Sequence, residues 1–350
     1  MAVFTVPNVK ISGIAACVPR QFEDNMELSL IPEVDRKPFI DTVGIRYRRI
    51  AEDGVTASDL CFTAADKLLN DLNWDRQEIK VLIFITQTPD YLIPNTSSLL
   101  QERLQLSKSC LAFDINLGCS GYVYGLSVIG SLLQNMIGSK ALLLVGDIST
   151  KTISKKDKST VSLFSDAGTA TALEYSQNSE MYFNLQTDGK GYQDIMIPDG
   201  GFRNQVTEQS FVEKEYEKGV TRNSLHMKLD GVKIFNFSLR EIAPNIHALL
   251  EAKAIDKSSV DYYIFHQANL LMLESVRKKL KVEPEKVPYS LYDYGNTSSA
   301  TLPLTMVVRL KEQLRGGELK LLLAGFGVGL SWGSAYVETR NIVCSELIEV

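Results

Sequence analysis

Short apolar runs alternate with longer helical patterns along this chain. The short runs are bounded by polar or turn residues, which is typical of buried strands; they cover residues 81–86, 110–116, 141–147, 261–266 and 319–327. Longer patterns predict helices over residues 57–72, 96–104, 122–134, 235–253, 270–280 and 302–314. The first twenty residues hold a brief apolar stretch that predicts a first strand. Because strands and helices alternate, we expect an α/β fold.

The order of these elements recurs in the two halves of the chain. After strand 81–86 come helix 96–104, strand 111–116, a helix and strand 141–147. After strand 261–266 come helix 270–280, segment 287–292, a helix and strand 319–325. This duplication predicts an N-terminal half over residues 1–175 and a C-terminal half over residues 176–350, each built on a mixed sheet. The polar, glycine-containing residues 176–225 predict a linker and insertion between them.

Cys119 follows the strand at 110–116 and precedes the long apolar helix 122–134, so we expect it on a tight turn at a helix start. The amides of that helix would favour a thiolate, which would make Cys119 a nucleophile near neutral pH. A small buried cysteine at a close helix–sheet contact is the alternative interpretation.

His266 and Asn296 occupy comparable places in the second half. His266 ends the strand at 261–266, and Asn296 precedes a helix in the sequence YGNTSSA. Each alone has a structural interpretation, a packed histidine or a capping asparagine. Together with Cys119, they fall at the carboxyl ends of strands or just after them, where α/β sheets bind ligands, and this favours a shared site.

Composition narrows the class of protein. With a net charge of −5, the chain lacks the concentrated basic surface of a nucleic-acid protein. The longest apolar runs are too short for a membrane span, and the first residues do not form a secretory core, so we expect a cytoplasmic protein. The cysteines form no CxxC pair and predict neither a zinc site nor a disulfide framework; we expect no cofactor.

The chain resembles the 3-oxoacyl-acyl-carrier-protein synthase III family of the thiolase superfamily over nearly its whole length. The matching segments are FDINLGCSGYVYGLSV, residues 166–173, LDGVKIFNF, FHQANL, YGNTSSAT and FGVGLSWGSA. The resemblance implies a layered α-β-α-β-α thiolase fold and a condensing enzyme. Its substrates would be acyl-coenzyme A or acyl-carrier thioesters together with a malonyl thioester, leading to fatty acids, related lipids or ketides.

The resemblance also implies residue roles. Cys119 would carry the acyl group, while His266 and Asn296 would hydrogen-bond the enolate left by decarboxylation of the malonyl unit. The amides of Cys119 and Val328 would hold the second oxyanion. Further contacts would come from Phe235 under the site, Gly231 and Asn269 along the pantetheine tunnel, and Ile93 against the acyl pocket of the partner in a homodimer.

Two departures from the family pattern favour a carrier-bound primer over acetyl-coenzyme A. Pro38 and Thr42 stand where the family has a tryptophan and an arginine that grip the nucleotide, and Leu271 replaces a frequent arginine. Acyl carrier protein is acidic, so a basic surface is expected at Arg277, Lys278 and Lys279. A second basic run lies at Lys151, Lys155, Lys156 and Lys158. The alternative for the first cluster is a solvated helix end.

Other functions remain open. The chain could be an acyltransferase of the same fold or a specialised ketide synthase with a primer other than acetyl. A non-decarboxylating condenser needs a glutamate base, and none occurs between Asp114 and Lys140. A catalytically inactive partner subunit has no reason to keep Cys119, His266 and Asn296 together, and a cysteine hydrolase is also conceivable.

Overall fold

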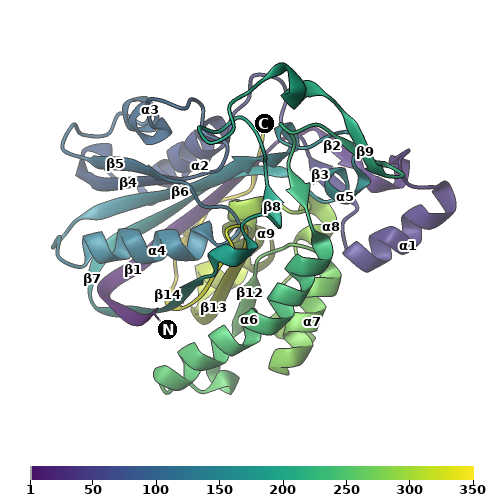
Figure 1. Cartoon of the computed structure of the whole chain (residues 1–350). Helices are drawn as coiled ribbons and strands as arrows, with labels where there is room; N and C mark the ends of the chain where they lie inside the picture. The colour runs from purple at the N-terminus through teal and green to yellow at the C-terminus, as the bar shows by residue number, and fades with distance from the viewer. Residues whose placement is uncertain (1) are drawn as a thin grey trace.

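The computed structural model describes residues 2–350, and most of its strands belong to one large mixed sheet (Figure 1). The main strand order is β12-β13-β14-β7-β6-β4-β5, and β1 pairs with β7, β15 and β16. The bounds of these strands are β1 Ala2–Val18, β4 Ile79–Ile85, β5 Leu111–Ile115, β6 Lys140–Ile148, β7 Asp166–Thr187, β12 Tyr262–Phe265, β13 Glu318–Gly327, β14 Ser331–Arg340, β15 Val343–Cys344 and β16 Ile348–Glu349. The expected first strand and all five expected short strands are therefore confirmed.

The long strands β1 and β7 join the two halves of the sheet system. Residues 166–174 of β7 pair with β6, whereas residues 181–187 pair with β14. β1 runs antiparallel to β7 along this whole length, with a register shift between Pro7 and Val9. The pair thus passes from the N-terminal strands to the C-terminal ones.

Helices cover the sheets in three layers. Their bounds are α1 Glu33–Val43, α2 Ala57–Leu72, α3 Thr96–Arg103, α4 Gly121–Leu133, α5 Lys158–Val161, α6 Gly231–Ala252, α7 Leu270–Leu280, α8 Leu291–Tyr294 and α9 Thr301–Gly316. Apolar residues of α4 and α9 share one core with strands of both halves, those of α2 form a second core with β4 and β6, and those of α6 and α7 form a third with β12, β13 and β14. This is the expected α-β-α-β-α arrangement.

Two expectations about segments need correction. The boundary at 175/176 falls inside β7, because the polar residues at its middle are a solvated part of one continuous strand. The linker and insertion therefore begin after Thr187. Segment 287–292, which takes the place of strand 111–116 in the repeated order, does not form a strand: Pro288 lacks the N–H that a sheet needs, and the chain turns directly into α8.

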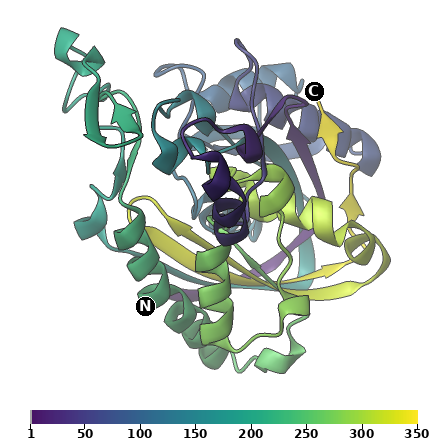
Figure 2. The same cartoon turned by 90° about the vertical axis from the view of Figure 1, so that its right-hand side faces the viewer.

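The insertion forms a projecting arm. Its base is the two-stranded ribbon of β8 Ile195–Met196 and β11 Lys228–Leu229, and its outer part carries β9 Lys214–Glu217 and β10 Val220–Arg222. Figure 2 shows this arm standing away from the layered body at the upper left. The two small strands β2 Phe22–Asp24 and β3 Tyr47–Arg49 flank α1 along the chain.

Candidate active site

Cys119 lies on the turn between β5 and α4 and is 7% exposed. β13 passes very close to this turn. A Cβ placed on Gly325 would lie 2.9 Å from the carbonyl oxygen of Cys119, and one on Gly327 would lie 2.9 Å from its sulfur. Glycine at these two positions therefore lets a strand of the C-terminal half reach the cysteine of the N-terminal half.

The sulfur of Cys119 is held by polar groups from the C-terminal half. The backbone amide of Val328 and the side chain of Ser298 both hydrogen-bond it. Burial nevertheless raises the pKa of Cys119 to about 11, and the nearby carboxyl of Asp147 acts in the same direction. The expectation of a thiolate near neutral pH is wrong, because desolvation outweighs the donors that surround the sulfur.

His266 directly follows β12 and is 2% exposed. Its backbone N–H donates to the carbonyl of Ala324 at 2.8 Å, and its Nδ1 lies 2.8 Å from the Oγ1 of Thr301. The ring of Phe326 meets the imidazole edge to face at 5.5 Å. Burial lowers the pKa of His266 to about 3, so the ring is neutral at ordinary pH.

Asn296 is fixed through its backbone and through one atom of its side chain. Its N–H donates to the carbonyl of Leu163, and its carbonyl accepts from the N–H of Ser165, both at 2.9 Å. Its Oδ1 accepts from the N–H of Ser298 at 2.9 Å. The side-chain oxygen is thus engaged, which leaves the NH₂ group as the donor for a ligand.

Ser298 connects the three residues that the sequence singled out. Its side chain hydrogen-bonds the sulfur of Cys119, its main chain lies beside the imidazole of His266, and its N–H donates to Oδ1 of Asn296. Ser298 has a positive φ of 51°, a conformation that a non-glycine residue adopts only when its neighbours hold it. Ser298 is not among the residues that the sequence singled out, and its place two residues after Asn296 is the signal that could have revealed it.

A buried serine pair fixes the turn that carries Val328. The Oγ atoms of Ser120 and Ser331 lie 2.7 Å apart, and Ser331 donates to the carbonyl of Val328 at 2.9 Å. The start of α4 and the β13–β14 turn are therefore locked together. This arrangement keeps the N–H of Val328 directed at the sulfur.

Asp147, at the end of β6, is a second residue that the sequence did not reveal. Its Oδ1 accepts from the N–H of Gln87 at 2.7 Å and from Thr86, and its Oδ2 accepts from the hydroxyl of Ser299 at 2.6 Å. Burial raises the pKa of this carboxyl. Because both oxygens are engaged, Asp147 acts as an anchor between β4 and the Ser298 loop rather than as a base.

The remaining expected contacts lie in different surroundings. Gly231 begins α6, and a Cβ there would meet nothing within 4 Å, so the space above it is open. Asn269 caps α7 by accepting from the N–H of Met272 at 2.9 Å. Phe235 packs with the core of α6 and α7, whereas Phe326 is the ring found against His266. Ile93 is 86% exposed.

The expected basic cluster lies at the end of α7 that is farther from His266. Lys257, which precedes β12, donates to the carbonyl of Leu280 at 2.7 Å. This contact places the end of α7 near the amino-terminal end of β12, whereas His266 follows the carboxyl end of that strand. Arg277 is paired with Glu274 at 2.7 Å, and Lys279 donates to a carbonyl of α6 at 2.6 Å. Lys278 is exposed. The second basic run is also largely paired, through Lys151, Lys156 and Lys158.

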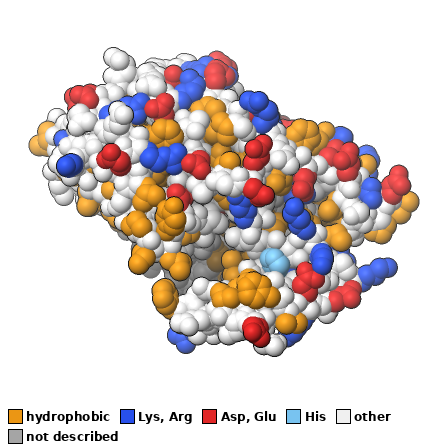
Figure 3. All heavy atoms as spheres, turned by 90° about the horizontal axis from the view of Figure 1, so that it is seen from above, with side chains coloured by type: hydrophobic (Ala, Val, Ile, Leu, Met, Phe, Trp, Pro, Cys, Tyr) orange, Lys and Arg blue, Asp and Glu red, His pale blue; other side chains and the backbone are white. Residues whose placement is uncertain are grey.

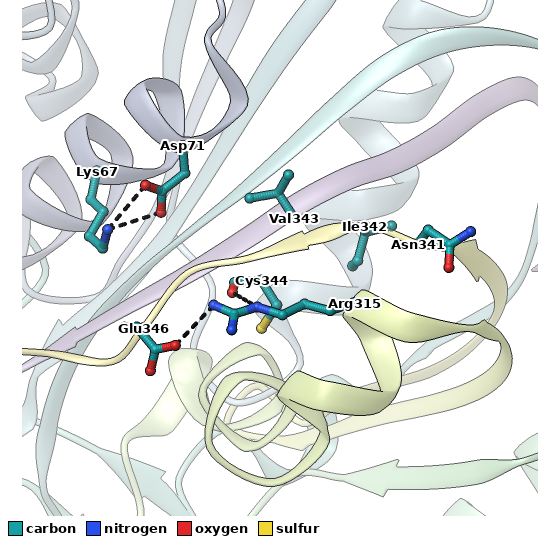
Figure 4. Close-up of a pocket in the computed structure, with 8 residues that line it drawn as sticks. All are labelled: Lys67, Asp71, Arg315, Asn341, Ile342, Val343, Cys344 and Glu346. Atoms are coloured by element: carbon teal, nitrogen blue, oxygen red, sulfur yellow. Dashed lines mark hydrogen bonds and ion pairs between the residues drawn. The ribbon is translucent and has the colours of Figure 1, made fainter.

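Two cavities are relevant to the search for a site. One, of about 310 Å³, is lined by Ser298 and Val328 and therefore adjoins Cys119. Another, of about 420 Å³, lies between α2, α9 and β15 (Figure 4). Its charged side chains pair with one another: Lys67 with Asp71 and Arg315 with Glu346. Of these two cavities, only the first is next to a candidate nucleophile, the thiol of Cys119.

Two negative results concern residues 2–350. They contain no group of three or more histidine, cysteine or acidic side chains arranged to hold a metal ion. Over the same range, no helix is both long and apolar enough to cross a bilayer.

Comparison with known proteins assigns the family. Two models match, 3-oxoacyl-[acyl-carrier-protein] synthase III over residues 113–189 and the C-terminal region of that synthase over residues 250–339. The beta-ketoacyl-[acyl-carrier-protein] synthase III of Streptococcus agalactiae is 32% identical, and the alignment covers 94% of this chain and 98% of the relative. The chain belongs to the 3-oxoacyl-acyl-carrier-protein synthase III family. As a member of it, the protein is a condensing enzyme of the acyltransferase type.

Solved structures agree with the assignment to the synthase III family. A 3-oxoacyl-(acyl-carrier protein) synthase from Burkholderia xenovorans LB400 superposes with a TM-score of 0.93 at 37% identity, covering 99% of each chain. A 3-oxoacyl-(acyl-carrier-protein) synthase III superposes with a TM-score of 0.90 at 35% identity, covering 95% of this chain and 99% of that one. The thiolase fold expected from the sequence is confirmed.

Proposed function

We propose that this synthase III family member joins an acyl group held on Cys119 to a malonyl unit carried by acyl carrier protein, with loss of carbon dioxide. The contacts made by Ser298 support the proposal most directly. They bring a nucleophilic sulfur, a neutral imidazole and an amide NH₂ to one point. These are the groups needed for acyl transfer followed by enolate stabilisation.

The first half-reaction loads the enzyme. The thiol of Cys119 loses its proton, the sulfur attacks the carbonyl of the acyl thioester, and the carrier thiol leaves with a proton. The N–H of Val328 already points at the sulfur, so it is placed to donate to the oxyanion that forms beside it. Because the pKa of Cys119 is raised to about 11, ionisation of the thiol is part of the barrier to this step.

The second half-reaction forms the new carbon–carbon bond. The bond between the malonyl α-carbon and its carboxylate breaks, carbon dioxide leaves, and the electron pair becomes an enolate. Donors from His266 and Asn296 would hold the enolate oxygen. The α-carbon then attacks the acyl carbonyl, the carbon–sulfur bond to Cys119 breaks, and a 3-oxoacyl thioester leaves. No external base is needed, since decarboxylation generates the carbanion.

The carrier is proposed to be a protein rather than coenzyme A. Pro38 and Thr42 lie exposed on α1, and the hydroxyl of Thr42 is bonded to the carbonyl of Pro38 at 2.9 Å. Neither offers a stacking face or a guanidinium to a nucleotide. Since Arg277 is paired inside its own helix and Lys279 is bonded to a carbonyl of α6, Lys278 remains as the basic residue of α7 for an acidic carrier.

The enzyme is proposed to work as a homodimer in the cytoplasm. β5 is an edge strand of the sheet, and Tyr91, Leu92 and Ile93 are exposed apolar residues on the loop after β4. A second copy would cover this surface, which would otherwise invite aggregation. Since the chemistry requires Cys119 as a free thiol, a reducing compartment suits it.

Intact-mass spectrometry combined with release of labelled carbon dioxide tests the proposed reaction. We expect an acyl adduct on the wild type and none on Cys119→Ala. His266→Ala and Asn296→Ala should keep the adduct but lose about 10²–10³ in decarboxylation, the usual effect of removing one oxyanion donor. An acyl adduct on the Cys119→Ala variant would refute the assignment of Cys119 as the nucleophile. Unchanged decarboxylation in the other two variants would favour the acyltransferase alternative.

A further inference from the structure

The cavity of about 310 Å³ beside Cys119 is the place where an acyl chain on that residue would lie. Two of its lining residues, Ser298 and Val328, hydrogen-bond the sulfur of Cys119. Gln87 also lines it, and a Cβ built on Gly118 would lie 2.4 Å from the side-chain oxygen of Gln87. The cavity is therefore bounded by residues that surround the nucleophile.

The wall of this cavity carries hydrogen-bonding groups that the protein does not use. Gln87, Asn116 and Ser149 all line it. Within residues 2–350, the side-chain amides of Gln87 and Asn116 and the hydroxyl of Ser149 have no hydrogen-bond partner. An alkyl chain in the cavity would offer these three groups no hydrogen bond, whereas a hydroxyl group would offer both a donor and an acceptor.

The charge on the wall restricts the ligand further. Asp147 lines the same cavity and is 1% exposed, so little water screens it. A second carboxylate at the end of an acyl chain would be repelled there, whereas a neutral hydroxyl or amide would be tolerated. The lining also contains Ile195, Ile197 and Met227, which suit a few methylene or methyl groups.

We propose that the acyl group loaded on Cys119 is a short, neutral chain bearing a hydroxyl group, read by Gln87, Asn116 and Ser149, rather than a plain alkyl chain. This inference rests on the proposed condensation, because it assumes that Cys119 is acylated. The size of the cavity and its mixture of apolar residues with three unpaired polar groups fit such a chain.

Matched thioesters of N-acetylcysteamine test the inference. Butyryl, 3-hydroxybutyryl and succinyl groups are offered separately, and the rate of adduct formation on Cys119 is followed by intact-mass spectrometry. We expect the hydroxylated chain to load at least about tenfold faster than butyryl, since a polar site discriminates against an analogue lacking the hydroxyl. Succinyl should load most slowly.

Variants identify the groups that read the hydroxyl. Asn116→Leu and Gln87→Leu should raise butyryl loading and bring the ratio of the two rates towards one. Gln313→Leu replaces an exposed amide of α9 that does not line the cavity, and it should leave the ratio unchanged. Both test positions are exposed, so the variants should fold.

The outcomes separate this inference from the proposed function. If butyryl loads and condenses as fast as 3-hydroxybutyryl in the wild type, the polar primer is refuted while the condensation stands. If the ratio of 3-hydroxybutyryl to butyryl loading rates is unchanged in both Asn116→Leu and Gln87→Leu, the polar primer is also refuted. If none of the thioesters, acetyl included, forms an adduct, the proposed condensation itself fails.

Discussion

The Nδ1 atom of His266 lies 2.8 Å from the Oγ1 atom of Thr301, so the two groups share one hydrogen bond whose direction depends on the imidazole tautomer. Thr301 Oγ1 also lies 3.1 Å from the carbonyl oxygen of Ser298. Its single proton can be given to only one of them. To hold an enolate, His266 must carry its proton on Nε2, so Nδ1 must accept from Thr301.

We therefore expect Thr301→Val to change the tautomer of His266. Without the hydroxyl, a proton on Nδ1 gains the Ser298 carbonyl as its acceptor, and Nε2 loses its proton. Decarboxylation should fall by about 10- to 100-fold, somewhat less than on removing a donor outright. Acylation of Cys119 should persist, and Thr301→Ser should restore the rate.

Nitrogen NMR of the imidazoles provides the direct measurement. The chain has only three histidines, so assignment is simple. The wild type should show His266 protonated at Nε2, and Thr301→Val should show it protonated at Nδ1. An Nδ1–H tautomer in the wild type would contradict this assignment of the donor.

The raised pKa of Cys119 makes a second prediction. Since its pKa is about 11, the thiolate fraction rises about tenfold for each pH unit between 7 and 10, and alkylation by iodoacetamide should follow it. Asp147→Asn removes a negative charge that raises this pKa, so it should speed alkylation at pH 8. Peptide mapping by mass spectrometry distinguishes Cys119 from Cys110, which is also partly accessible. Rapid, pH-independent alkylation of Cys119 from pH 6 to 8 would show that the helix amides lower the pKa of the thiol by more than burial raises it.

The sequence predicted those site residues that lie next to strands and helices with a regular pattern. Cys119, His266 and Asn296 each follow or precede a short apolar strand or a helix with a clear pattern, and helices 57–72 and 270–280 have the predicted bounds. The rule that ligands bind at the carboxyl ends of strands is then sufficient to predict that these three residues share one site.

What the sequence could not predict depends on contacts between distant segments. The pKa of Cys119 is set by burial under β13, which no local pattern reveals. Ser298 and Asp147 look like ordinary loop and strand-end residues until the two halves meet. The polar middle of β7 resembles a linker, because residues 176–180 are polar and partly or fully exposed.

Gly327→Ala should inactivate the enzyme without unfolding it. A Cβ at this position would lie 2.8 Å from the Cβ of Cys119 and 2.9 Å from its sulfur, so either the cysteine or the Val328 turn must shift. We expect acyl loading to fall at least about tenfold, since small displacements of reacting groups are costly. Gly201→Ala meets nothing within 4 Å and serves as the matched control. Normal loading by Gly327→Ala, with an unchanged melting temperature, would show that this close approach has no role.

Ile93→Asp tests the dimer. Ile93 is 86% exposed and stands beside exposed Leu92, so a second copy that covers this loop would bury both. A charge at its centre should shift the protein from dimer to monomer in light scattering at micromolar concentration, because burying an unpaired carboxylate is strongly unfavourable. Val34→Asp, another highly exposed apolar residue, on α1, is the control. A wild type that is already monomeric would contradict the proposed assembly.

Reversal of charge at the end of α7 tests docking of the carrier. Lys278→Glu should raise the KM for a carrier-bound malonyl thioester several-fold and leave kcat unchanged, because an exposed charge guides association rather than chemistry. On the face shown in Figure 3, basic and acidic side chains are interspersed. The effect should shrink as salt rises from 0.1 M to 1 M, where the screening length falls from about 10 Å to about 3 Å.

Lys108→Glu, an exposed lysine next to the N-terminal end of β5, is the control with the same change in net charge. A small pantetheine thioester should show no change in KM with either variant. Equal losses for the carrier-bound and the pantetheine substrate would mean that Lys278 acts through the fold of α7, and the carrier surface would then have to lie elsewhere.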